Sequence, residues 1–108
     1  MKCLHIQLQP ELCAGDAEQI VDDLTSIATN SDSDASLNVE RGDDNGPYIN
    51  INIQSADVAS LWSAVSSRIS SDSALASCAI VCCEGDDGWD DYLLLHHYDR
   101  GETLDNLS

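Results

Sequence analysis

The residues in this chain that could do chemistry gather between positions 82 and 99. The stretch CCEGDDGWDDY, residues 82–92, is followed directly by LLLHHYD, so thiols, carboxylates and imidazoles fall within eighteen residues. Such groups bind transition metals, act as nucleophiles or exchange protons. The same run could equally be a β-hairpin with an acidic turn, and the elements around it decide between these interpretations.

The spacing of these residues argues against a metal site. On a strand, neighbouring side chains point to opposite faces, so Cys82 and Cys83 cannot bind one ion together. His96 and His97 are separated for the same reason. The chain contains no C-x-x-C, H-E-x-x-H or calcium-loop pattern. We therefore expect no metal and no cofactor, and a cross-strand site made by Cys82 and His96 is the alternative left open.

A catalytic role for the same residues is also disfavoured. A nucleophilic cysteine needs positive surroundings that lower its pKa, whereas residues 84–91 hold four Asp and one Glu. No Gly-rich phosphate loop opens either expected helix, and acids on a loop do not line the cleft that glycoside hydrolysis requires. We expect that the chain is not an enzyme.

The charge of the chain indicates what it binds. Its 108 residues include 4 Lys and Arg against 20 Asp and Glu, a formal net charge of −16. Nucleic acids and anionic membranes are bound through Lys and Arg, so both are disfavoured and a basic protein partner is expected. Screening acts beyond about 8 Å, so a partner would feel the dense acids at 84–91. Adaptation to a salt-rich cytoplasm is the competing explanation of the acidity.

The cysteines and the apolar runs indicate the compartment. Five cysteines are an odd number, and residues 1–10 contain no continuous apolar run of the kind found in a signal peptide. No run reaches the length of a membrane span. We expect a cytoplasmic protein whose reduced cysteines serve mostly as small buried apolar residues.

The hydrophobic pattern predicts one domain over residues 1–98 and a flexible C-terminal tail over 99–108. Five segments are expected as strands: residues 3–8, 36–40, 47–54, 78–83 and 92–98. Apolar residues at helical spacing follow the first and third strands, with Asp16 and Ser55 as expected N-caps. Residues 70–77 are expected to form a loop, and residues 84–91 a turn.

This order of elements, β-α-β-β-α-β-β, resembles the split βαβ, ferredoxin-like arrangement, with a fifth strand added at an edge by a hairpin. The expected fold is an α+β sandwich in which a mainly antiparallel five-stranded sheet carries two helices on one face. The opposite face would be polar, with His5 and Tyr48 beside the amides of Asn50 and Asn52.

The acidic hairpin is the first candidate site. Trp89 is expected either to fold back over the sheet edge or to act as an aromatic anchor, with carboxylates steering a basic partner. The expected partner-binding residues are Asp86, Asp87, Trp89, Asp90 and Asp91. In composition the chain is similar to nuclease-immunity proteins, which are small and acidic with Tyr or Trp among the acids. That similarity implies an immunity protein or antitoxin that occludes a basic toxin.

Two other functions remain open. A ligand-binding regulatory module would use the polar sheet face around His5, Tyr48, Asn50 and Asn52. An acidic chaperone for a secreted protein would need a large exposed apolar groove. The chain could act as a monomer, or as a homodimer formed through an edge strand.

Overall fold

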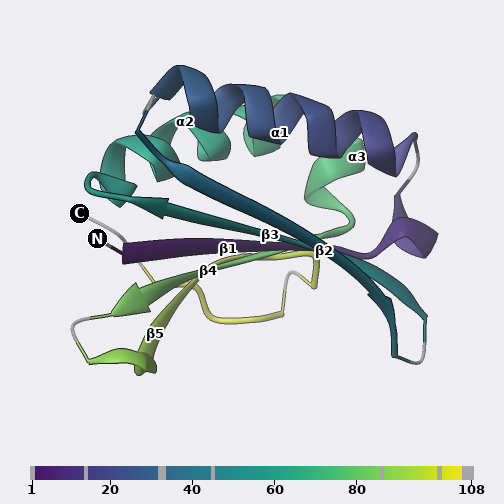
Figure 1. The fold of residues 1–108 in the computed structure, drawn as a ribbon. Coiled ribbons are helices and arrows are strands. Elements are labelled where there is room, and N and C mark those ends of the chain that lie inside the picture. The colour runs from purple at the N-terminus through teal and green to yellow at the C-terminus, as the bar shows by residue number, and fades with distance from the viewer. Residues whose placement is uncertain are drawn as a thin grey trace.

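A five-stranded antiparallel sheet with helices above one face makes up the chain in the computed structural model (Figure 1). The structure describes residues 2–13, 15–31, 34–44, 46–85, 87–99 and 101–105. Its elements in chain order are β1 (Lys2–Leu8), the 3-10 turn η1 (Pro10–Leu12), α1 (Ala17–Ser31), β2 (Ser36–Asp43), β3 (Pro47–Ser55), α2 (Val58–Ser71), α3 (Ser73–Ala76), β4 (Ala79–Gly85) and β5 (Gly88–His97). The predicted α+β class and the five-stranded antiparallel sheet are confirmed.

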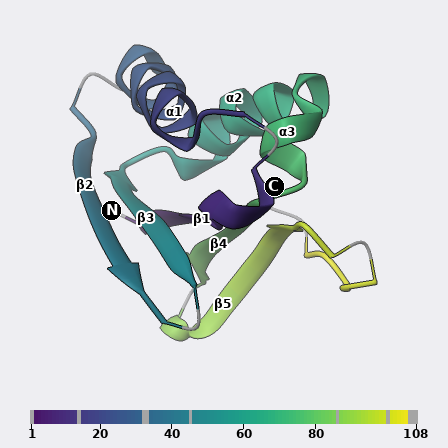
Figure 2. The same ribbon diagram turned by 90° about the vertical axis from the view of Figure 1, so that its right-hand side faces the viewer.

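The strands lie in the order β2-β3-β1-β4-β5, which makes β1 the central strand. The register places Ile6 of β1 opposite Ile51 of β3 on one side and opposite Val81 of β4 on the other. Figures 1 and 2 both show α1 and α2 side by side above the same face of the sheet. The other face carries no helix among the described residues.

The core lies between the helices and this covered face. Every second residue of β1, namely Leu4, Ile6 and Leu8, is fully buried. The core also contains Ile49, Ile51 and Ile53 of β3, Leu24 of α1, and Leu61 and Val65 of α2. Burying one such side chain contributes about 1.5–3 kcal/mol, so this layer is the main source of stability. Cys78 and Cys83 belong to the same cluster, as expected for cysteines that act as small apolar residues.

The predicted N-cap residue is confirmed for α1 and is wrong for α2. The Oδ1 of Asp16 accepts a hydrogen bond from the N–H of Glu18 at 3.0 Å, as an N-cap does. Ser55 was expected to cap the second helix, and this prediction is wrong. Asp57 caps α2 instead, accepting from the N–H of Ser60 at 3.1 Å. Ser55 is the buried last residue of β3, and its Oγ accepts from the N–H of Asp57 at 3.0 Å.

The segment expected as a loop at 70–77 contains the helical turn α3. Asp72 starts it, because its Oδ1 accepts from the N–H groups of Ala74 at 3.1 Å and Leu75 at 3.3 Å. Leu75 is 1% exposed and so holds the turn against the core. A single turn is too short to produce a helical period in the sequence, which is why the pattern missed it.

The last hairpin is tighter than the sequence predicts. β4 continues to Gly85 and β5 already begins at Gly88, so the turn expected at 84–91 is wrong and Trp89 to Asp91 lie in a strand. Register shifts between Val81 and Cys82 and between Cys83 and Gly85 mark bulges in the pairing. A Cβ at Gly85 would lie 1.7 Å from the carbonyl oxygen of Asp91, so the two strands approach as only glycine permits.

The outer edge of β5 has a partner in the segment expected as a tail. The N–H of Asp105 donates to the carbonyl of Leu94 at 2.7 Å, and the N–H of Leu94 donates to Asp105 Oδ2 at 2.8 Å. Both backbone groups of Leu94 are thereby satisfied. None of the helices in the described ranges is long and apolar enough to cross a membrane.

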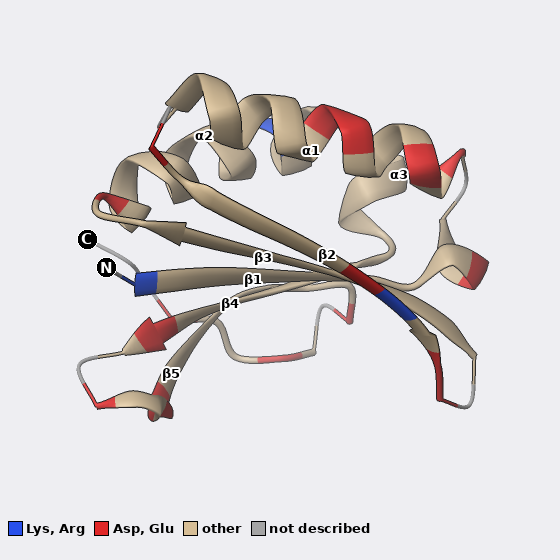
Figure 3. Cartoon of the chain, viewed as in Figure 1, with Lys and Arg blue, Asp and Glu red and all other residues tan. Residues whose placement is uncertain are grey.

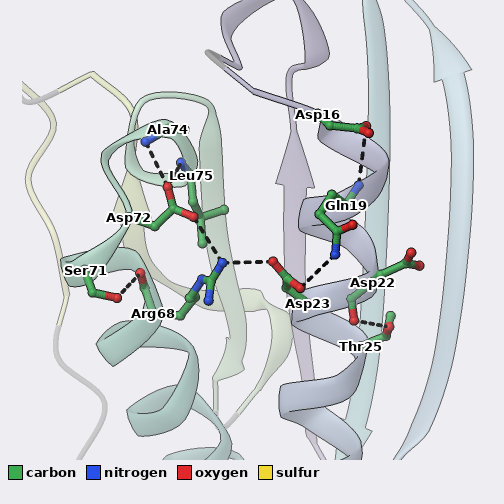
Figure 4. Close-up of polar contacts among 10 residues, drawn as sticks. All are labelled: Asp16, Gln19, Asp22, Asp23, Thr25, Arg68, Ser71, Asp72, Ala74 and Leu75. Atoms are coloured by element: carbon green, nitrogen blue, oxygen red, sulfur yellow. Dashed lines mark hydrogen bonds and ion pairs between the residues drawn. The ribbon is translucent and has the colours of Figure 1, made fainter.

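Arg68 links the two long helices (Figure 4). Its guanidinium lies 2.8 Å from Oδ2 of Asp23 on α1 and 3.4 Å from Oδ2 of Asp72 after α2. The Oδ1 of Asp23 also accepts from Nε2 of Gln19 at 3.1 Å. One cation therefore joins α1, the end of α2 and the cap of α3.

We expect Gly85→Ala to lower the free energy of unfolding by about 2 kcal/mol, because the added Cβ collides with backbone rather than with a movable side chain. Chemical denaturation followed by circular dichroism measures this. Gly15→Ala is the matched control, since a Cβ there meets no atom within 4 Å. Equal stability of the two variants would show that β5 does not cross Gly85 this closely.

We expect Arg68→Ala to cost about 1 kcal/mol at low salt, with the loss shrinking at about 0.5 M salt as the charges are screened. Arg41, which pairs with Glu18 on the exposed side of α1, is the matched control. Its replacement by alanine should change stability little, because that pair is well exposed to water. A salt-independent loss in Arg68→Ala would contradict the electrostatic origin.

Candidate functional site

Hydrogen bonds between side chains of neighbouring strands order the uncovered face of the sheet. The register sets His5 opposite Asn52 on β3 and opposite Cys82 on β4. His5 Nδ1 and Asn52 Oδ1 lie 2.6 Å apart, and Gln7 Nε2 donates to Asn50 Oδ1 at 3.1 Å. Because Oδ1 of an amide can only accept, His5 Nδ1 carries the hydrogen of this bond. The ring nitrogen Nε2 of His5 has no partner among the described residues.

Trp89 lies over this polar face. Its ring meets the His5 ring edge to face, with centroids 6.3 Å apart and planes at 85°, within the range preferred by aromatic pairs. The pairing of β4 with β5 is irregular between Cys83 and Gly85, opposite the start of β5, and Trp89 reaches His5 on the central strand β1. Trp89 nevertheless stays 46% exposed. The contact brings a residue of the acidic hairpin onto the polar sheet face, so the two candidate sites meet there.

Two shallow hollows flank Trp89. The first, of about 450 Å³, is lined by His5, Asn52, Cys82, Trp89 and Tyr92. The second, of about 440 Å³, is lined by Cys3, Ser36, Leu37, Asn38, Asn52, Gln54, Glu84 and Trp89. Because Trp89 and Asn52 line both hollows, the two form one continuous surface. We call the first hollow the Trp89 pocket.

Acidic residues of the β4–β5 hairpin lie on one side of this surface (Figure 3). Glu84 is fixed, because its Oε1 accepts from the N–H of Cys3 at 2.9 Å. Asp87, Asp90 and Asp91 are exposed, and none of them forms an ion pair within the described residues. Arg41 and Arg68 are paired elsewhere, with Glu18 and with Asp23 and Asp72. The negative charges of Asp87, Asp90 and Asp91 can therefore attract a cation that approaches the open face.

The thiol in the Trp89 pocket is not activated. Burial raises the pKa of the Cys82 thiol, so the group is protonated at neutral pH. No hydrogen bond joins Cys82 to His5 in the part of the chain that the structure describes. Both residues contribute shape and polarity to the pocket, and neither is arranged as a nucleophile with its base.

The structure separates the pair that sequence alone left open as a metal site. Cys82 lies opposite Leu94 and lines the open face, whereas His96 lies opposite Val81. Nε2 of His96 lies 3.0 Å from the carbonyl of Ala76, next to α3. Within the described ranges, no three His, Cys, Asp or Glu side chains are grouped so that they could hold a metal.

The predicted site residues fall into three groups. His5, Asn52 and Trp89 line one pocket, with Asp90 and Asp91 following Trp89 in β5 and Asp87 in the turn before it. Tyr48 and Asn50 instead line a separate hollow of about 340 Å³ with Gln7, Gln9, Asp44 and Gly46. Tyr48 packs on Gly42, where a Cβ would lie 2.2 Å from its hydroxyl oxygen. Asp86 lies outside the described residues.

Sequence reasoning does not place Tyr92 or Cys82 in this site. It also does not show that Glu84 is held in a fixed position beside it. In a regular strand, residues 89 and 92 would point to opposite faces, so alternation separates two side chains that the bulge brings together. The available signal is the spacing itself, since two aromatic residues bracket Asp90 and Asp91.

Comparisons with protein-family models, curated proteins and solved structures find no match to this chain. Its function is therefore inferred from the chemistry of the site, which is an exposed aromatic surface on a polar sheet face beside carboxylates that form no ion pair with any described residue.

We expect the acids to be detectable in the quenching of Trp89 fluorescence. In Trp62→Phe protein, Trp89 is the sole tryptophan, because the chain has two. Relative to free N-acetyltryptophanamide, caesium should quench it at least about 3-fold better than iodide at low salt, since the local field attracts cations and repels anions.

Replacing Asp90 and Asp91 by Asn should reduce this bias. The same change at Asp43, the last residue of β2, and at Asp44, directly after it, should leave the bias intact, because both lie at the other end of the sheet (Figure 1). Equal relative quenching by the two ions would show that the hairpin carboxylates are too far from Trp89 to act on it.

Proposed function

We propose that this chain is a small acidic binding protein that neutralises a cationic protein, specifically an immunity protein or antitoxin that occludes a basic toxin. The observation that carries the proposal is Trp89, which is 46% exposed on the uncovered face of the sheet and lies beside carboxylates without ion partners among the described residues. Exposed aromatic residues supply central binding energy in interfaces, and charges steer the encounter.

The mechanism is steric and electrostatic occlusion. The partner's positive surface, which would otherwise bind its own anionic substrate, docks on the Trp89 pocket and the adjoining hollow. With a net charge of −16, the chain attracts such a surface from a distance and speeds association. The chain performs no reaction in this role.

The finer description of the fold belongs to the same proposal. A ferredoxin-like arrangement is supported by the strand order β2-β3-β1-β4 and by the position of α1 after β1 and α2 after β3. A cytoplasmic location is supported by five cysteines without disulfides, as expected for a reduced compartment. A monomer fits the contact of Asp105 on β5, and an edge-paired homodimer would use β2 instead.

A second candidate function is the binding of a small polar ligand on the sheet face. The hollow lined by Gln7, Asp44, Tyr48 and Asn50 favours it, because amide and phenol groups there can hydrogen-bond a polar molecule beside a single carboxylate. Binding of that kind would be insensitive to salt and would not depend on Asp90 or Asp91.

The test is capture of partners from lysate of the native organism on the immobilised full chain, at low salt and at about 0.5 M salt, where screening shortens to a few Å. We expect one stoichiometric basic protein that is retained at low salt and weakened at high salt. The Asp90→Asn/Asp91→Asn chain should retain much less of it, and the Asp43→Asn/Asp44→Asn chain as much as the wild type.

Kinetics with the captured protein then separate the roles of the two residue types. Trp89→Ala should raise koff at least about 10-fold, because it removes a central contact, and Asp90→Asn/Asp91→Asn should mainly lower kon. A partner whose retention ignores both salt and the Asp90→Asn/Asp91→Asn change would move the function to the hollow of Tyr48 and Asn50.

A further inference from the structure

The Trp89 pocket combines aromatic walls with a polar floor. Trp89 and Tyr92 are 46% and 56% exposed, so both rings are accessible to a bound group. At the floor, Nε2 of a neutral His5 is an acceptor, because Nδ1 carries the hydrogen that bonds Asn52. The Oδ1 of Asn52 keeps a second lone pair for a further donor. A guest with a flat apolar face and several N–H donors matches both parts.

The charges around the pocket select the sign of that guest. Glu84 shares the adjoining hollow with Trp89, and Asp90 and Asp91 follow Trp89 in β5. Lys2, the first residue of β1, contributes one positive charge against these three. The balance remains negative, so phosphates and carboxylates are repelled, and a neutral aromatic group gains nothing from the field.

We propose that the Trp89 pocket holds the guanidinium of an arginine side chain of the basic partner. This inference rests on the proposed function, since it names the group through which that partner is anchored. Guanidinium is planar, stacks on aromatic rings and presents several donors in a fixed fork, whereas the lysine ammonium is compact and strongly hydrated. The apolar walls formed by Trp89, Tyr92 and the protonated Cys82 therefore favour arginine over lysine.

The pocket is large enough to admit one arginine side chain. Its volume of about 450 Å³ lies near the lower end of the range for sites that enclose small molecules, and it is open to solvent. The neighbouring hollow beside Glu84 gives room for the backbone or a second side chain of the partner.

The experiment is a titration of the isotope-labelled full chain with three blocked tripeptides, in which arginine, lysine or citrulline stands between two glycines. The indole N–H signal of Trp89, assigned with Trp89→Phe, reports on the pocket, and that of Trp62 on α2 is the internal reference. We expect the arginine peptide to shift Trp89 and to bind at least about 5-fold more tightly than the lysine peptide. Citrulline, which has nearly the same shape without charge, should bind at least about 10-fold more weakly.

Matched variants separate stacking from general charge. Tyr92→Ala should abolish the preference for arginine over lysine while it leaves the weak attraction of both. Asp43→Asn/Asp44→Asn should change neither affinity. Equal binding of arginine and lysine, or of arginine and citrulline, would overturn the inference, as would shifts of Trp62 as large as those of Trp89.

The two proposals fail in different ways. If the arginine peptide does not bind, but a basic protein is still retained through Asp90 and Asp91, the arginine pocket is wrong and the proposed function stands. If the peptide binds at Trp89 with the expected preference, but no basic protein is retained, the pocket is a guanidinium site and the proposed function is wrong.

Discussion

The pairing register of β1 is the constraint on which both faces of the molecule depend. Ile6 faces Ile51 and Val81 beneath the helices, and its neighbour His5 faces Asn52 and Cys82 on the open side. A slip of one residue would exchange these rows, burying an imidazole and exposing the core. The apolar contacts that stabilise the protein therefore also fix the floor of the Trp89 pocket. The site needs no separate device to position His5, because the core already holds it in place.

The described charges are divided between the two sides of the sheet. Arg68 is used between α1 and α2, and Arg41 of β2 is used on Glu18 of α1, so both offset acids around the helical layer. The β4–β5 hairpin receives no such partner among its described acids, although repulsion between them opposes folding there. The ion pairs of Arg41 and Arg68 thus lie on the helical side of the sheet, and in the proposed function the binding of a cationic partner on the other side would relieve the repulsion at the hairpin.

The strands with clean alternation, β1 and β3, could be predicted from sequence because one face of each is buried and the other is wet. The hairpin could not, since bulges break the period that alternation relies on, and the close approach at Gly85 depends on two segments rather than one. His5 and Trp89 were each predicted in a candidate site, but their contact spans 84 positions and leaves no local pattern. Asp57 rather than Ser55 caps α2, because β3 continues to Ser55 and two residues separate it from the helix. N-cap propensity alone does not show where the strand ends.

The contact between Asp105 and Leu94 has a consequence for the behaviour of the protein at high concentration. An edge strand with free N–H and C=O groups is a template for further strands, and continued addition leads to intermolecular β-sheet growth. Asp105 occupies both groups of Leu94, as a neighbouring strand would, and it does so with a charged side chain that cannot be extended into a ladder. Asp105 thereby blocks the addition of a further strand at Leu94, on the edge opposite the charged strand β2.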